Sequence, residues 1–235
     1  MTFSVSEELF SKYPEVRIGC MLVSGIDNSQ NANETLLKKL AEQTATITKE
    51  YSLETITQVP FVARWREIYR SFGAKPSDYR SSIENLIRMA LKGRVLEHIN
   101  TLVDIYNYIS LKYKLPVGGE DTDKMIGALQ LTIATGNEPE VQLLGDQKAE
   151  KPFIGEVLYR DDEGVICRCW NWREGQRTML TKDTKNAILV IEANCAEEYP
   201  VLEEALNGLA SMVQHFVGGK IQRAILTKES SVANF

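Results

Sequence analysis

Three short stretches of the chain carry side chains that could bind or convert a small polar molecule. In the first, Asn107 and Ser110 follow Asn100 and Asp104 at helical spacing. Neutral amides beside one carboxylate suit the recognition of a small polar group such as an ammonium. The same spacing also fits a helix cap at Asn100 followed by a solvated face. The pattern alone leaves both interpretations open.

The second stretch is the turn-rich segment 115–127, LPVGGEDTDKMIG. Gly118 and Gly119 allow positive φ and a close approach of the backbone to a ligand. Asp121 and the acids around it suggest a metal, but the segment lacks the ligand count and spacing of a calcium loop. Aspartate is also an ordinary turn residue. We therefore expect a loop that binds no metal and a protein without a cofactor.

The third stretch is 165–173, VICRCWNWR. As one extended strand over 165–172, it sends Cys167 and Cys169 to the face opposite Trp170 and Trp172. The cysteines then resemble small core residues, because zinc requires further Cys or His ligands. The two indoles either cover a sheet face or line a pocket in which a flat ring stacks.

The chain has few other residues that could take part in catalysis. Glu192 follows the apolar run 187–191 and is either a surface charge at a strand end or an acid in a pocket. The two histidines, His98 and His215, have no Ser or Cys nucleophile near them in the sequence. The chain also lacks a nucleophile elbow, a phosphate-loop motif and a dinucleotide fingerprint.

Charge is distributed unevenly along the chain, whose net charge is −5. Residues 61–100 hold eight Lys or Arg residues against four acids. Arg80, Glu84 and Arg88 lie four apart, as in ion pairs along one helix face. The alternative is a patch that contacts a nucleic-acid backbone. The RNA-binding candidates in this segment are Arg64, Lys75, Arg80 and Arg88.

These side chains need a scaffold, and 235 residues that are 43% apolar and 25% charged describe one globular domain over residues 1–235. Hydrophobic periodicity and capping residues predict helices at 33–51 and 61–72, from 81 and from 100 or 101, and at 201–217. Short apolar segments predict strands at 16–24, 128–133, 156–159, 165–172, 187–193 and 221–226. We expect an α+β fold whose helical first half packs on a mostly antiparallel or mixed β-sheet core.

The cellular setting follows from cysteines and hydropathy. Four cysteines set no disulfide framework, which favours a reduced cytoplasm. No apolar run reaches the roughly 18 residues that a membrane span requires. The first ten residues carry two acids and no basic cluster, so we expect no secretory signal and no membrane partner.

Four segments occur in the same order in a known domain: 71–86 (SFGAKPSDYRSSIENL), 100–108 (NTLVDIYNY), 115–119 (LPVGG) and 121–127 (DTDKMIG). They resemble the B-three/B-four domain of the bacterial phenylalanyl-tRNA synthetase beta subunit, over about residues 60–217. In the synthetase this domain hydrolyses tyrosine wrongly attached to phenylalanine tRNA. The resemblance implies a tRNA- or RNA-binding protein that could act as a free-standing hydrolase of mischarged aminoacyl-tRNA. The chain is too short for a synthetase, so we expect no ligase activity.

The resemblance also implies a substrate site. Asn107, Ser110 and Asp121 would orient the substrate, while Arg173 would hold a phosphate or carboxylate. Glu192 matches the acid that reads the tyrosine hydroxyl. The remaining wall residues would be Gly118, Gly119, Trp170, Asn171 and Trp172, and the amides of the two glycines could stabilise an oxyanion.

Two departures from the family pattern affect the chemistry. Where the synthetase has proline–x–histidine–alanine–phenylalanine–aspartate, residues 116–121 read PVGGED, so the editing histidine is missing. Where it has a small glycine-rich strand, residues 169–173 read CWNWR. Three functions stay open: a deacylase of mischarged tRNA, an inactive RNA-binding module, and a sensor of a free amino acid.

Overall fold

Several helices begin at residues that cap their N-termini. The computed structural model describes residues 1–29, 32–94 and 96–235. Asn33, Ser81 and Asn100 each accept a hydrogen bond from the backbone three residues on, and each starts a helix. Pro60 opens another helix at its first turn. The helices are α1 (Glu7–Lys12), α2 (Glu34–Glu50), α3 (Pro60–Ser71), α4 (Ser82–Leu91), α5 (Thr101–Tyr113) and α6 (Tyr199–Phe216).

The strands form two main sheets. The six-stranded sheet has the order β12-β1-β4-β7-β8-β9, in which only β1 and β4 run parallel. Its strands are β1 (Thr2–Val5), β4 (Leu129–Ile133), β7 (Val157–Arg160), β8 (Val165–Arg168), β9 (Arg173–Glu174) and β12 (Val232–Asn234). The four-stranded sheet is antiparallel throughout, with the order β11-β2-β10-β3. Its strands are β2 (Arg17–Ser24), β3 (Val117–Asp121), β10 (Asn186–Ala193) and β11 (Lys220–Leu226), and β5 (Val141–Gln142) pairs with β6 (Ala149–Glu150).

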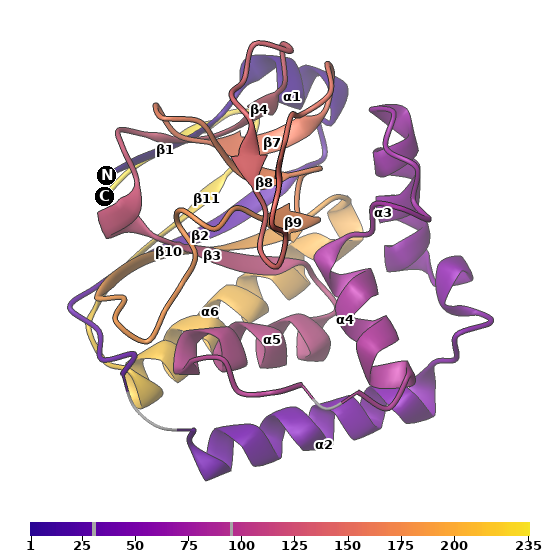
Figure 1. Cartoon of the computed structure of the whole chain (residues 1–235). Helices are drawn as coiled ribbons and strands as arrows, with labels where there is room; N and C mark the ends of the chain where they lie inside the picture. The colour runs from indigo at the N-terminus through magenta and orange to yellow at the C-terminus, as the bar shows by residue number, and fades with distance from the viewer. Residues whose placement is uncertain (30–31, 95) are drawn as a thin grey trace.

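The four-stranded sheet has an apolar core on each face. Met21, Leu189 and Ile191 point toward α5 and α6, which lie directly under this sheet in Figure 1. Ile18 and Ile188 point the other way and pack with residues of the six-stranded sheet. Helix α2 lies outermost, against α5 and α4. The predicted α+β class with helices packed on a mixed sheet is confirmed.

Two predicted elements are wrong in detail. The segment 118–121 is not a loop: it belongs to β3, which pairs with β10, and neither Gly118 nor Gly119 has positive φ. The strand predicted over 165–172 ends at Arg168, because Cys169 and Trp170 take φ values of 44° and 64° and turn the chain. Trp170 is consequently fully buried. None of the described helices is long and apolar enough to cross a bilayer.

Candidate functional site

A cavity of about 790 Å³ lies between the two main sheets and is lined at the side by α4 and α5. The four-stranded sheet contributes Gly118, Glu120, Ile188, Val190 and Glu192 to its wall. The six-stranded sheet contributes Leu129, Tyr159, Cys167 and Glu174. The volume suits a ligand of the size of a nucleoside or an amino acid ester.

Glu192 is a buried acid of this cavity and not a surface charge. It is the second-last residue of β10, is 1% exposed, and accepts a 2.5 Å hydrogen bond from the Tyr159 hydroxyl. Its second oxygen accepts from the Asn171 amide, which is held in turn by the Tyr69 hydroxyl and the Ser82 backbone. Burial raises the pKa of Glu192 to about 7, and these hydrogen bonds limit the rise.

Glu120 and Glu174 form a second acidic position in the cavity. Burial and the neighbouring Glu174 carboxyl raise the pKa of Glu120 well above its ordinary value. Burial also raises the pKa of Glu174 to about 7, and a hydrogen bond from the Gly119 amide opposes it. Use of the Gly118 and Gly119 amides as oxyanion donors stays a prediction.

Two predicted residues of α5 lie at the wall. Asn107 is half-buried, and within the described part of the chain its side-chain amide makes no hydrogen bond, so the amide is free for a ligand. Ser110 is buried, and its hydroxyl donates to the Leu115 carbonyl at 2.7 Å. Asn100 caps α5, and Asp104 pairs with His98 Nδ1 at 2.5 Å, so neither belongs to the cavity.

The turn after β8 places its aromatic residues at different depths. Trp170 packs edge-on against Trp65 in the core and touches the cavity. Trp172 is half-buried and stacks edge-on against Tyr79, with ring centroids 4.6 Å apart. Arg173 also lines the cavity, but its guanidinium is held by Asp146 at 2.8 Å and by the Leu144 carbonyl. Cys167 and Cys169 are buried free thiols.

Asp121 does not line the cavity. Its carboxylate accepts from the Thr184 hydroxyl at 2.7 Å and from the Asp123 amide, and it starts a short 3₁₀ turn. Side chains alternate along β3, so Asp121 faces away from Glu120 and toward the other side of the sheet. Among the described residues no group of three or more His, Cys, Asp or Glu side chains could hold a metal ion.

The predicted basic patch is largely neutralised by acids. Glu84 is fully buried and pairs with Arg66 at 2.9 Å, Arg88 at 2.8 Å and Arg80 at 3.9 Å. Arg64 pairs with Glu198, while Lys75 lies 3.8 Å from the exposed Asp78. The ion pairs along α4 predicted from the i, i+4 spacing are confirmed. Binding of RNA by these four residues stays a prediction.

Comparison with known proteins identifies the family. Residues 64–199, more than half of the chain, match the B3/4 domain. The chain belongs to the B3/4 domain family. The phenylalanine–tRNA ligase beta subunit of Fusobacterium nucleatum subsp. nucleatum is 32% identical over 105 residues, which are 43% of this chain and 13% of that protein. The chain thus corresponds to a small part of this relative.

A solved structure with a related outline is an N-terminal fragment of the phenylalanyl-tRNA synthetase beta subunit from Pyrococcus horikoshii. The likeness covers 95% of this chain and 53% of that one, at a TM-score of 0.48 and 15% identity.

The B3/4 segment contains the whole cavity wall, since every lining residue falls between Ser82 and Glu192. The B3/4 resemblance did not mark Glu120, Glu174, Tyr159 or Arg94, although all four line the cavity. Alternation along β3 could have revealed Glu120, because it shares a face with Gly118. No signal in the sequence marks Glu174, which comes from a strand of only two residues.

Proposed function

We propose that this chain binds the aminoacylated 3′ end of a tRNA, with the amino acid seated in the cavity. The observation that carries the proposal is that the entire cavity wall lies inside the B3/4 segment. A relative that shares this segment is named as the beta subunit of phenylalanine–tRNA ligase. The cavity is large enough for an amino acid joined to the terminal adenosine.

Three kinds of side chain support this ligand. The free amide of Asn107 can donate to and accept from the ester or the amino group. The carboxyl of Glu192 offers an acceptor for a hydroxyl or an ammonium. The half-buried ring of Trp172 offers a face on which the terminal base can stack.

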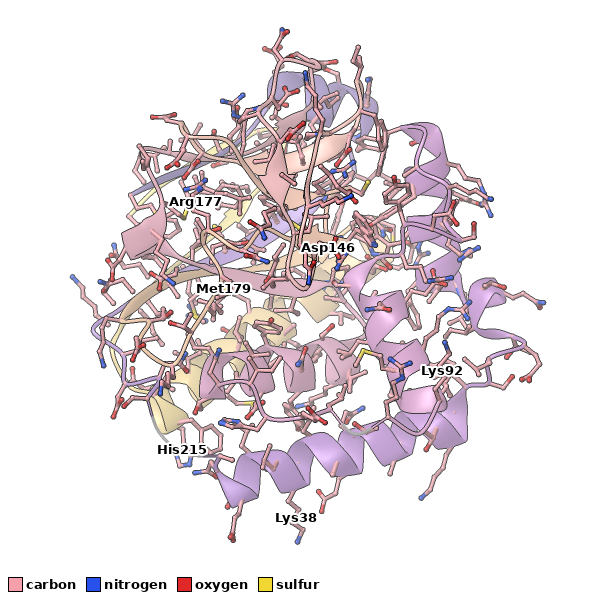
Figure 2. The ribbon with its side chains drawn as sticks, viewed as in Figure 1. Lys38, Lys92, Asp146, Arg177, Met179 and His215 are labelled. Carbon is pink, nitrogen blue, oxygen red and sulfur yellow. The ribbon has the colours of Figure 1, made fainter. Side chains whose placement is uncertain are left out.

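Contacts with the tRNA backbone need cations that are not already paired. Arg94 is exposed, lines the cavity, and forms no ion pair among the described residues. Lys92 lies exposed at the end of α4, as its label in Figure 2 shows. We assign phosphate binding to Arg94 and Lys92 in preference to Arg64, Arg80 and Arg88, whose guanidinium groups contact buried acids. Lys75 can join them if it leaves its exposed partner Asp78.

Hydrolysis of the ester is the finer part of the proposal. No histidine of the described residues lines the cavity, so we assign to a carboxyl the acceptance of the proton from the attacking water. A carboxyl whose pKa lies near 7 is suited to that role at neutral pH. Glu192 meets this requirement, and its hydrogen bonds to Tyr159 and Asn171 hold it in one orientation.

A panel of tRNAs charged with different amino acids tests both parts. Binding that weakens steeply as salt rises, together with release of one amino acid, supports a deacylase. Binding without release supports an RNA-binding module. A Glu192→Gln variant that still binds but no longer releases amino acid would assign the proton acceptor, whereas full release by the variant would contradict it.

A second function is binding of a free amino acid. The pairing of Arg64, Arg80 and Arg88 with acids leaves few cations for RNA, and the net charge is −5. Calorimetric titration with free amino acids, in the absence of tRNA, distinguishes this function. Tight binding of an amino acid together with no binding of any tRNA would favour it over the first proposal.

A further inference from the structure

The cavity contains an acidic pair that the contacts above leave unused. Glu120 comes from β3 and Glu174 from β9, so each main sheet brings one carboxyl to the same space. A Cβ built on Gly118 would lie 3.4 Å from Glu174 Oε1. Gly118 and Glu120 share the cavity face of β3, because side chains alternate along a strand. The two carboxyl groups are therefore neighbours.

The charge of Arg177 lowers the pKa of Glu120, but this guanidinium forms its ion pairs with Asp161 and Glu163. No Lys, Arg or His among the described residues forms an ion pair with either carboxyl. Glu120 is 7% exposed, and its Oε2 is buried without a hydrogen-bond partner. The hydroxyl of the neighbouring Thr178 lies close enough to lower the pKa of Glu120. Buried polar atoms are rarely left unpaired in folded proteins, so the unpaired Oε2 of Glu120 points to a ligand group.

The nearest guanidinium is already committed elsewhere. Arg177, labelled in Figure 2, donates to both carboxylate oxygens of Asp161, at 2.7 and 2.8 Å, and to the Lys124 carbonyl. Two carboxyl groups alone are also a poor site for Ca²⁺ or Mg²⁺, which take six or more ligands. An organic cation with several N–H donors matches the pair better.

The pair lies well apart from the other acid of the cavity. Glu120 is paired in the sheet with Ile188, and Glu192 lies four residues farther along β10. At about 3.4 Å per residue the two backbone positions are roughly 14 Å apart along the strand direction. The cavity thus offers acidic groups at two separated positions, which a ligand with a cation at each end would satisfy.

We propose that Glu120 and Glu174 bind the distal cation of a basic side chain, the ammonium or guanidinium of a lysine- or arginine-like aminoacyl group. The proposal rests on the proposed function, because it names the class of amino acid that the aminoacyl end carries. The α-ammonium group would lie toward Glu192, and the distal cation would take the place of the proton that the acidic pair otherwise holds.

Stable analogues of the aminoacyl end test the proposal directly. In 3′-aminoacylamino-3′-deoxyadenosine an amide replaces the ester, and the amino acid can be lysine, norleucine, arginine or citrulline. The lysine–norleucine pair and the arginine–citrulline pair each keep the adenosine and the α-amino group and differ only at the end of the side chain, which is charged in lysine and arginine. Titration calorimetry at pH 8 should show a preference of about tenfold or more for lysine over norleucine and for arginine over citrulline.

Two variants assign that preference to the pair. Glu120→Gln and Glu174→Gln should each bring the affinity ratios, lysine over norleucine and arginine over citrulline, close to one. Binding of the norleucine analogue should stay unchanged or become tighter. The matched control is Glu97→Gln, which changes an exposed acid of the same cavity and should keep the preference. Because each change to glutamine removes a like charge from a buried pair, both variants should fold, and thermal unfolding checks this.

The outcomes separate the two proposals. Equal binding of charged and uncharged analogues would overturn the cation site and leave the proposed function intact. A preference that survives both variants would overturn its assignment to Glu120 and Glu174. Failure of all four analogues to bind the wild-type protein would instead contradict the proposed function itself.

Discussion

Glu192 has donors on both of its oxygens, and these donors come from different parts of the chain. Tyr159 belongs to β7, while Asn171 lies in the turn after β8 and is itself held by Tyr69 of α3 and the first amide of α4. One carboxyl thus ties two helices and both sheets to the wall of the cavity. A change at this residue affects the protonation and the stability of the whole site.

We predict that Glu192→Gln flattens the pH dependence of stability. In the wild type the folded carboxyl keeps its proton up to about pH 7, whereas the unfolded one releases it near 4.5. Its contribution to stability is therefore fully present below pH 4.5 and is lost as the pH rises through 7, by up to ~3 kcal/mol. Urea unfolding from pH 4.5 to 8.5 should show the variant gaining stability relative to the wild type as pH rises.

Glu97→Gln serves as the control for this experiment, because it removes an exposed acid of the same cavity and leaves the buried Glu192 in place. The contribution of Glu174 is common to all these proteins and cancels in the difference. A difference between Glu192→Gln and wild type that stays constant across the pH range would contradict the assignment.

Replacement of Trp172 tests the stacking surface. Trp172→Ala should weaken binding of aminoacyl-adenosine analogues by about 1–3 kcal/mol if the base stacks on the indole. Trp172→Phe keeps an aromatic ring and should lose less binding free energy. The indole also packs on Tyr79, so the free energy of unfolding must be measured on the same samples. Unchanged affinity in a stable alanine variant would remove Trp172 from the site.

At the scale of residues, the sequence predicted side chains whose type is unusual and missed those whose position is unusual. Asn107 and Trp172 stand out by composition, and both line the cavity. Glu174 looks like any surface glutamate, and only the pairing of β8 with β9 brings it over β3. Asp121 has a plausible type, but the alternation of β3 turns it away from the cavity.

Strand β3 forms part of the cavity wall, and its two glycines have different neighbours. A Cβ on Gly119 would lie 2.3 Å from Leu189 Cδ2 and 3.2 Å from the Ile188 carbonyl. On Gly118 the nearest atom would be Glu174 Oε1 at 3.4 Å. Gly119 therefore allows β3 to pack against its neighbours, whereas Gly118 leaves room for the acidic pair.

We predict that Gly119→Ala destabilises the fold by about 1–3 kcal/mol, because the added methyl overpacks the core under β3. The matched variant Gly118→Ala should change stability little but should weaken ligand binding, because its methyl meets the Glu174 carboxyl. Chemical denaturation and titration of both variants check this. If both variants lose the same free energy of unfolding, the close packing at Gly119 does not explain the loss.

At the scale of elements, helices were the easier part to predict. Caps at Ser81 and Asn100 and the spacing of apolar residues place α4 and α5 within a few residues. The glycine pair of β3 resembles a turn in sequence, yet its pairing with β10 needs no side chain. The left-handed turn at Cys169 and Trp170 was not predictable, because non-glycine residues rarely adopt positive φ.

The molecule as a whole has two apolar cores that share the four-stranded sheet. We propose that residues 1–235 form one cooperative domain, because both ends of the chain contribute strands to both main sheets. All three tryptophans lie in or against the core between the sheets. Tryptophan fluorescence and far-ultraviolet circular dichroism should therefore report the same unfolding midpoint. Two separate midpoints would mean that the core beneath α5 and α6 unfolds independently.

The class of fold followed from the order of helices and strands, but the partners of the strands did not. No pattern indicates that Thr2–Val5 pairs with both Leu129–Ile133 and Val232–Asn234. Pairing across such separations depends on how the whole core closes, which a local window of sequence does not contain. The cavity is a product of that closure.

The position of β2 has a consequence for how the protein is made. This strand lies between β10 and β11, so its two partners leave the ribosome more than 160 residues after it. At roughly 5–20 residues per second, the apolar run from Ile18 to Val23 waits on the order of ten to thirty seconds with both edges unpaired. During that interval a nascent chain is prone to pair with another. The yield of this protein should therefore depend more on protection by a chaperone during synthesis than on the stability of its finished fold.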